Sequence, residues 1–299
     1  MAHDHHHNHN ELGNIRLVFF LNLVFTILEI FGGLWTNSLA ILADAIHDLG
    51  DSFALGSAWF LERLSMKKGD ALYSYGYRRF SLLGALISAT VLIAGSLFIL
   101  FHAIPRIFHP QHPYAPGMVL FAIIGIAVNG AAVLRLKGST GINAKMVAWH
   151  LLEDVLGWAA VLAVSLILLI RDIPFLDPLL SCLITAYVLF NVLKNLGKTF
   201  GIFMQGVPEG VDIATIEEDM RSLTHVTCTH HTHIWSLDGM HHVLTTHVVV
   251  DKDATREDII FIKDHIRNLM LTHSMDHSTV EIEYSGEECR INGDTCNCS

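Results

Sequence analysis

Long apolar stretches alternate with short polar breaks over the first two thirds of the chain. Six of these stretches come close to the roughly 20 apolar residues that a helix needs to cross a bilayer. They cover residues 14–34, 38–62, 79–103, 115–135, 144–170 and 174–197. Glycine, proline and charged residues fill the breaks between them. The pattern therefore predicts an all-α, six-helix transmembrane domain over residues 14–200.

A different pattern begins near residue 207. Apolar positions there follow helix and strand periods in the order helix, strand, strand, helix, strand. The five elements are predicted at residues 212–223, 227–237, 241–251, 255–271 and 277–285. We expect a small α+β domain over residues 207–286, with both helices on one face of an antiparallel sheet.

Composition supports a membrane protein, because 52% of the residues are hydrophobic and only 16% are charged. The mean hydropathy is +0.44. The net charge of −10 comes mainly from residues 207–299, which hold 17 Asp/Glu against 6 Lys/Arg. An acidic domain of this kind is suited to collecting cations and is a poor binder of nucleic acid.

The distribution of Lys and Arg predicts the orientation. With six spans, both termini lie on one side, and the loops on that side are rich in basic residues. These are Arg16, Arg63, Lys67, Lys68, Arg78, Arg79, Arg135, Lys137, Lys145, Lys194 and Lys198. The opposite loops carry only Arg106 and Arg171, so the positive-inside rule puts both termini in the cytoplasm. The short connection between the fourth and fifth spans favours a bacterial plasma (inner) membrane.

Ionisable residues interrupt the second and fifth apolar stretches. In "LADAIHDLGDS" they recur at helical spacing and share one helix face; they are Asp44, His47, Asp48 and Asp51. In "WHLLEDVLG" the corresponding residues are His150, Glu153 and Asp154. A charged carboxylate at membrane depth costs about 3 kcal/mol or more, so such residues are rare and usually functional.

Each stretch contains one His-x-x-x-Asp pair, His47/Asp51 and His150/Asp154. Two facing helices would bring two imidazole nitrogens and two carboxylate oxygens together, which is a tetrahedral set suited to Zn²⁺. Calcium and magnesium prefer more oxygen ligands and no imidazole. The alternative is that these residues only hold the helices together, but no intramembrane Lys or Arg accompanies them. Asp44, Asp48 and Glu153 are the weaker candidates.

Several motifs together resemble the cation diffusion facilitators, a family of zinc exporters. They are "NSLAILADAIHDLGDS", "YSYGYRRFSLLGALIS", "INAKMVAWHLLEDVLG", "GVPEGV" and "HIWSLDGMHHVLTTHV". The resemblance runs in order from about residue 14 to residue 285. It implies six transmembrane helices, a cytoplasmic ferredoxin-like domain, a homodimer, and exchange of Zn²⁺ for H⁺.

The resemblance also implies specific metal ligands. The transport site of the family falls on His47, Asp51, His150 and Asp154, a set associated with zinc and sometimes with cadmium or cobalt. The metal sites of the soluble domain fall on His233, His247, His277 and Glu283. A further loop site of some members is not expected, because Tyr73 and Tyr77 stand at its histidine positions.

The two ends of the chain leave alternatives open. Residues 1–13 form a tail whose "HDHHHNHN" is either a native zinc antenna or part of an affinity tag. Residues 287–299 form a tail with Cys289, Cys296 and Cys298, which either bind metal or have no chemical role. For cysteines in a cytoplasmic domain we expect metal ligation or free thiols rather than disulfides.

The expected function is efflux of Zn²⁺, with Cd²⁺ and Co²⁺ as further candidates, in exchange for H⁺ by alternating access. Zn²⁺ would be the transported substrate and also a regulatory ligand. The alternative is a membrane zinc sensor that responds without transport, but no output module follows residue 285. A metalloenzyme is disfavoured, because the chain has no His-Glu-x-x-His motif and four protein ligands leave no open coordination position.

Overall fold

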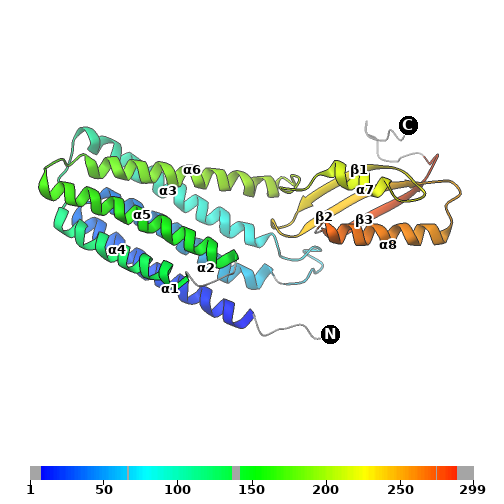
Figure 1. The fold of residues 1–299 in the computed structure, drawn as a ribbon, viewed down its shortest axis with the longest axis horizontal. Coiled ribbons are helices and arrows are strands. Elements are labelled where there is room, and N and C mark those ends of the chain that lie inside the picture. Colours follow the sequence, from blue (N-terminus) through cyan, green and yellow to red (C-terminus); the bar gives the residue numbers. More distant parts are fainter. Residues whose placement is uncertain (1–7, 66, 137–141, 274, 288–299) are drawn as a thin grey trace. The chain divides into compact units, whose positions relative to one another are not determined.

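The computed structural model describes residues 8–65, 67–136, 142–273 and 275–287 (Figure 1). The chain divides into two compact units. The first comprises residues 1–67 and 83–196, and the second comprises residues 68–82 and 197–299. The loop that joins the second and third helices therefore belongs with the C-terminal unit.

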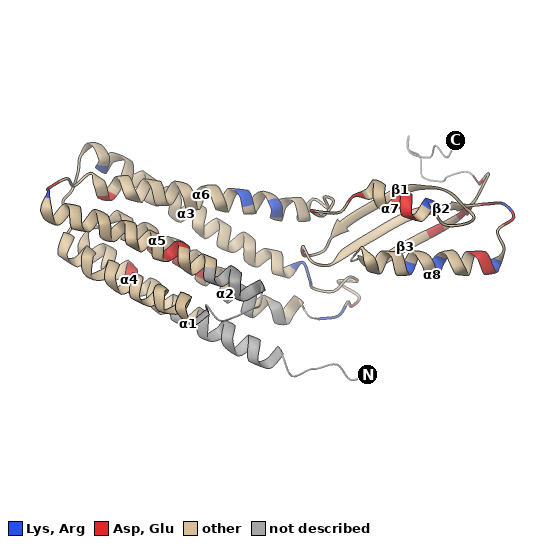
Figure 2. Ribbon diagram, in the orientation of Figure 1, with Lys and Arg blue, Asp and Glu red and all other residues tan. Residues whose placement is uncertain are grey.

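Six long helices make up the described part of the first unit, although the first residues of α3 and the last turns of α6 fall in the second. They are α1 (Asn8–Thr36), α2 (Leu39–Ser65), α3 (Phe80–Phe108), α4 (Ala115–Leu136), α5 (Ile142–Ile170) and α6 (Leu176–Phe203). Figure 2 shows that charged residues are absent from most of their described length. Several of them extend beyond the predicted ends, because hydropathy marks only the apolar part of a helix and not the turns that continue past it.

Among the residues that the structure describes, four helices are long and apolar enough to cross a membrane by length and composition. They are α3, residues 115–134 of α4, residues 149–170 of α5, and α6. A shorter apolar helical stretch, Asn22–Thr36, lies in α1. These findings confirm a helical domain of membrane type.

Small residues let the helices of the first unit approach one another. The indole of Trp158 on α5 is 1% exposed, and a Cβ placed on Gly125 of α4 would lie 2.2 Å from it. Only glycine therefore fits at this crossing of α4 and α5. Contacts also join α1 to α2 and α4, and α2 to α5, while α3 and α6 share a small cluster around Leu92 and Val188.

A buried carboxylate fixes the start of α2. Asp177, in the first turn of α6, is 2% exposed. Its carboxylate accepts hydrogen bonds from the backbone N–H of Leu39 at 2.8 Å and of Ala40 at 3.3 Å, and from the Ser38 hydroxyl. It therefore satisfies donors that the first turn of a helix leaves without partners. This cap sets the position of α2 against α6.

The second unit contains five elements in the predicted order. They are α7 (Ile213–Arg221), β1 (Val226–Ser236), β2 (His242–Val250), α8 (Arg256–Thr272) and β3 (Met275–Tyr284). The strand order is β1-β2-β3. The first pair is antiparallel and the second is parallel, so the predicted all-antiparallel sheet was wrong. Because α8 runs back between β2 and β3, the two strands start at the same end of the sheet.

Both helices of this unit pack into one core. Ile216 of α7 and Ile262 of α8 are buried in it beside Leu244 and Val248 of β2. Side chains alternate between the two faces of a strand, so His247 points to the opposite face. That face is available for a polar site.

Replacing Asp177 by Ala should destabilise the first unit. Loss of the carboxylate removes the cap from α2 and leaves buried N–H groups without partners, so we expect a loss of about 2 kcal/mol. The thermal unfolding midpoint of the purified protein in detergent measures this.

The matched control for Asp177 is Asp172→Ala. Asp172 contacts His112 at 2.9 Å, but its side chain is 74% exposed, so the change should stay within about 0.5 kcal/mol. Equal midpoints for the two variants would contradict the capping role.

Candidate metal centres

The first candidate centre lies between α2 and α5. His47 and Asp51 of α2 and His150 of α5 each offer one ligand atom, and these three atoms lie within 4.8 Å of one another. His150 Nε2 is 3.0 Å from Asp51 Oδ2, and His47 Nε2 is 3.8 Å from the same oxygen. The two imidazole rings have centroids 5.7 Å apart. The i, i+4 spacing places His47 directly before Asp51 on the face of α2.

These distances fit a tetrahedral ion. Ligand bonds of about 2.0–2.1 Å to zinc place two ligand atoms about 3.3 Å apart at the tetrahedral angle. The separations of 3.0 and 3.8 Å lie on either side of that value. The Nδ1 atom of His47 is buried and has no hydrogen-bond partner among the described residues.

The fourth predicted ligand, Asp154, lies next to this group. Its Oδ2 is 3.9 Å from His150 Nε2, and the residue is 9% exposed. The structure therefore brings three of the predicted ligands together and holds Asp154 against the third.

The neighbouring acidic residues differ in their surroundings. Glu153 is exposed and accepts a hydrogen bond from Tyr187 of α6 at 3.3 Å, so it points away from the group. Asp44 and Asp48 are each 6% exposed. A Cβ on Gly157 of α5 would lie 3.6 Å from Asp44 Oδ1, which shows how closely α5 approaches this part of α2.

Glu29 on α1 was not among the predicted site residues. It is fully buried, and no N–H group or hydroxyl of the described residues donates to its carboxylate oxygens. Its hydrogen-bond neighbour is another carboxyl group, that of Asp48 on α2. A single carboxylate inside the apolar sequence of residues 14–34 was the signal that could have identified it.

The second candidate centre lies on the sheet of the C-terminal unit. It contains His230 of β1, His247 of β2 and Glu283 of β3. His247 Nδ1 is 2.6 Å from Glu283 Oε1, and His230 Nε2 is 3.2 Å from Glu283 Oε2. The side chains of all three are 5–12% exposed. Glu281 adds a further oxygen 3.5 Å from His247 Nε2.

A bulge in β1 selects His230 for this group. His230 pairs with His247, whereas His233 pairs with Thr245, so β1 carries one extra residue between these pairs. His231 takes the left-handed backbone conformation there, with φ at 49°. Such a bulge reverses the alternation of side chains along the strand. Residues 230 and 233 would otherwise lie on opposite faces, but the extra residue puts His230 on the face of His247.

Two predicted ligands of the C-terminal unit lie outside the group. His233 is exposed, and His277 is exposed with its ring 5.4 Å from that of Tyr75. His277 and Glu283 are six residues apart on β3, or about 20 Å along an extended strand. His247 and Glu283 are the two members of the predicted set that the structure brings together.

Burial lowers the pKa of His230 from its ordinary value of 6.5, while Glu283 acts in the opposite direction. A lower pKa means that protons compete less with a metal for the imidazole nitrogen. The neutral form that can bind a metal is thus favoured at neutral pH. Two imidazoles and a carboxylate form a donor set suited to zinc.

The C-terminal unit contains one cysteine among its described residues. Cys228 on β1 is disulfide-bonded, which corrects the expectation of free or metal-binding thiols at this residue. Cys289, Cys296 and Cys298 lie outside the described residues, as does the His-rich segment of residues 1–7.

Comparison with known proteins identifies the family. The profile of the cation efflux transmembrane domain matches residues 15–204. The chain belongs to the cation diffusion facilitator, or cation efflux, family. Its sequence is 32% identical to a cadmium, cobalt and zinc/H⁺-K⁺ antiporter of Bacillus subtilis (strain 168), over 93% of this chain and 91% of that protein.

Two zinc transporters named ZitB are similar to this member of the cation efflux family. That of Pectobacterium atrosepticum is 31% identical over 98% of this chain and 91% of its own length. That of Escherichia coli (strain K12) is 29% identical over 98% of this chain and 96% of its own length. The family is one of transporters rather than enzymes. The first candidate centre lies inside the matched domain, and the second lies after it.

Replacing His230 by Ala should weaken zinc binding at the second centre. Removing one of three ligands should lower the zinc affinity roughly 10–100-fold or more. Zinc competition with a chelating dye, on the full-length protein carrying Asp51→Ala to remove the first centre, measures this affinity.

His233→Ala is the control, because His233 lies on the same strand but is exposed and does not belong to the group. Its affinity should match that of the unchanged site. An equal or larger loss in His233→Ala would show that the ligand set is the one that the family resemblance implied.

Proposed function

We propose that this protein exports Zn²⁺ from the cytoplasm in exchange for H⁺ by alternating access. The observation that carries the proposal is the convergence of His47, Asp51 and His150 between two helices, with Asp154 against His150. Proteins whose names include cadmium, cobalt and zinc antiport are among its relatives, so Cd²⁺ and Co²⁺ are further candidate substrates.

The proposed topology has six transmembrane helices, α1 to α6, over residues 14–200. Support comes from the four long apolar helices and from the apolar part of α1. The excess of Lys and Arg on one side favours a cytoplasmic location for both termini. We assign the protein to a bacterial inner membrane, with the ferredoxin-like domain of residues 207–286 in the cytoplasm.

The ligand atoms of the first centre make zinc the preferred substrate. Two imidazole nitrogens and two carboxylate oxygens match the ligands and the coordination number that Zn²⁺ favours. A site for magnesium or calcium would present more oxygens. We assign His47, Asp51, His150 and Asp154 as the four ligands of the transported ion.

Proton exchange follows from the same ligands. An imidazole must lose its proton before its nitrogen can bind a metal, and imidazole titrates close to physiological pH. In the inward-facing state, zinc would displace protons from His47 and His150. In the outward-facing state, protons would return to the imidazoles and release the metal. The proton gradient would thereby drive zinc out of the cell.

We assign a regulatory role to the second centre. The C-terminal residues 207–299 hold 17 Asp/Glu against 6 Lys/Arg, so two copies of this unit in a homodimer would repel each other without metal. Zinc at His230, His247 and Glu283 would reduce that repulsion. His233 and His277, which the family resemblance implies as ligands, are exposed and remain available for ligation shared with a second copy.

Replacing Asp51 or Asp154 by Ala should abolish zinc transport, since each change removes a proposed ligand and an anionic charge. Zinc uptake by proteoliposomes containing a zinc-sensitive dye measures the flux. Glu153→Gln is the matched control, because Glu153 directly precedes Asp154 but is exposed. Near-normal flux in Asp51→Ala would remove the site assignment.

Acidifying the vesicle lumen relative to the outside should increase zinc uptake, because protons leaving the lumen would drive the entry of zinc. A pH-sensitive dye in the lumen should report alkalinisation that accompanies uptake. Zinc flux with no response to the gradient would contradict proton exchange. Zinc binding without any flux would favour the membrane sensor instead.

A further inference from the structure

A cavity of about 420 Å³ lies within the second unit, apart from both candidate metal centres. Three segments line it: the loop of residues 72–80 before α3, Gln205 after α6, and the end of β1 with its turn. The lining includes two arginines and no carboxylate. We propose that this cavity binds a phosphate group, supplied by the headgroup of an anionic phospholipid.

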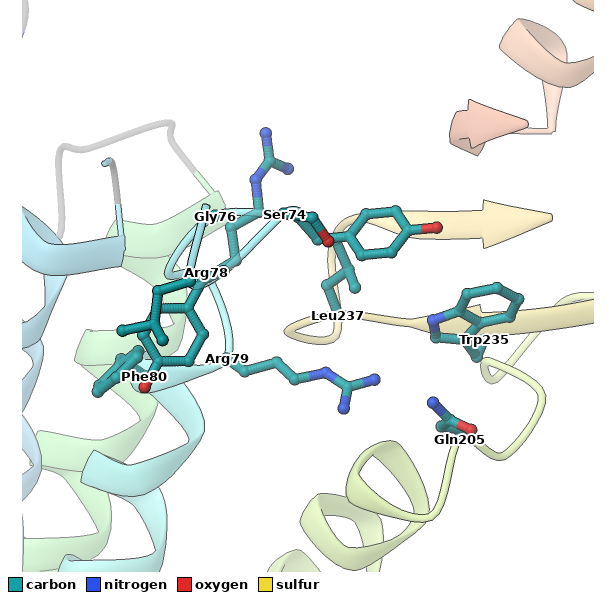
Figure 3. A pocket seen from close by; sticks show the side chains of 11 residues that line it. Ser74, Gly76, Arg78, Arg79, Phe80, Gln205, Trp235 and Leu237 are labelled. Atoms are coloured by element: carbon teal, nitrogen blue, oxygen red, sulfur yellow. The ribbon is translucent and has the colours of Figure 1, made fainter. Parts of the chain in front are cut away.

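Arg79 is placed to bind an anion, whereas the side chain of Arg78 turns away from it (Figure 3). Figure 3 shows the side chain of Arg79 extending across the hollow toward Gln205 and Trp235. A guanidinium offers planar, paired N–H donors that match phosphate oxygens, and the amide and the indole are further donor groups. The Nη1 atom of Arg78 is buried and has no hydrogen-bond partner among the described residues. Buried donors are rarely left without an acceptor.

No carboxylate of the described chain neutralises these arginines. The ion pairs that Lys and Arg form there belong to Lys198, Arg221 and Arg267. The nearby Asp70 instead accepts hydrogen bonds from the N–H groups of Leu72 and Tyr73 and from the Tyr77 hydroxyl. Within the described residues, the two arginines that line the cavity thus have no carboxylate partner.

Chain connectivity places the cavity at the level of lipid headgroups. Arg79 directly precedes α3, and Gln205 follows α6 by two residues. Both helices are long and apolar enough to span a membrane. Residues at the very ends of spanning helices lie in the interfacial region, where basic clusters bind anionic headgroups.

The loop beside the arginines is suited to a lipid rather than to a soluble anion. Leu72 is 76% exposed, Tyr73 40% and Tyr75 46%. Tyrosine is enriched at membrane interfaces, where its ring meets the acyl boundary and its hydroxyl meets water. A headgroup bound by Arg79 would leave its acyl chains beside such a surface.

A lipid titration of the full-length, zinc-free protein in neutral detergent tests the proposal. The probes are phosphatidylglycerol and, at the same mole fraction, phosphatidylcholine; a parallel arm uses inorganic phosphate at constant ionic strength. Thermal unfolding and native mass spectrometry report binding. We expect phosphatidylglycerol to raise the unfolding midpoint by about 5 °C and phosphatidylcholine to leave it unchanged.

Three variants sharpen the test. Arg79→Gln should weaken the response to phosphatidylglycerol roughly tenfold or more, since a charge-assisted contact is lost. Gln205→Gly removes the amide but suits the left-handed backbone at this position, where φ is 57°, so a folding defect would not explain a weaker response. Lys198→Gln is the control. It removes one positive charge near the end of α6, on a residue that does not line the cavity, so this variant should still respond to phosphatidylglycerol.

Each outcome of this experiment either supports or overturns the proposed lipid site. Protection by phosphatidylglycerol that Arg79→Gln weakens supports the lipid site. Protection by inorganic phosphate alone, lost in the same variant, supports the phosphate site with a soluble source. No protection by either, or equal losses in Lys198→Gln and Arg79→Gln, overturns the proposal. Because the measurement uses no zinc, its result is independent of zinc transport.

Discussion

One carboxylate oxygen organises the centre between α2 and α5. Asp51 Oδ2 lies 3.0 Å from His150 and 3.8 Å from His47, so it is the common neighbour of both imidazoles. Other carboxylates lie close by, on Asp44, Asp48, Asp154 and Glu29, and none forms an ion pair with Lys or Arg in the described chain. Like charges out of water repel strongly. The cluster therefore needs a mobile cation, and a metal ion and protons are alternative ways to meet that need. The proposed exchange of one for the other follows from this constraint.

Burial alone does not distinguish a functional carboxylate from a structural one. Asp177 is as buried as Asp44 and Asp48, yet its oxygens accept hydrogen bonds from Ser38, Leu39 and Ala40. A carboxylate that is satisfied by donors of the chain needs no ligand, and its role is to fix α2. Glu29 accepts no hydrogen bond from an N–H group or hydroxyl of the described chain, and its neighbour is the carboxyl group of Asp48. Functional and structural carboxylates therefore differ in how many hydrogen-bond donors the chain places around them. Only the structure shows this difference.

The sequence predicted what depends on periodicity and spacing. The i, i+4 pairs put His47 near Asp51 and His150 near Asp154, and the apolar stretches of two helices then had to face each other for the pairs to meet. The sequence could not predict the bulge in β1, because nothing in "THHTHIW" marks where one extra residue enters. The family resemblance implied His233, whereas the bulge brings His230 into the group. The parallel pairing of β3 was missed for a related reason: strand direction depends on where α8 packs, and the apolar pattern of the strand does not record that.

Net charge and local charge lead to different conclusions about the second unit. Residues 207–299 are acidic overall, which repels anions at a distance, but screening limits that repulsion to about 8 Å at physiological ionic strength. Arg78 and Arg79 come from the loop between α2 and α3, outside the acidic segment, and they have no carboxylate in the cavity with them. A soluble anion would have to reach them against the long-range field. A lipid is already held at high local concentration beside the ends of α3 and α6 and avoids much of that cost. The same unit can thus present a cation site on its sheet and an anion site at its loop. The high local concentration of lipid headgroups favours a lipid as the anion at the loop.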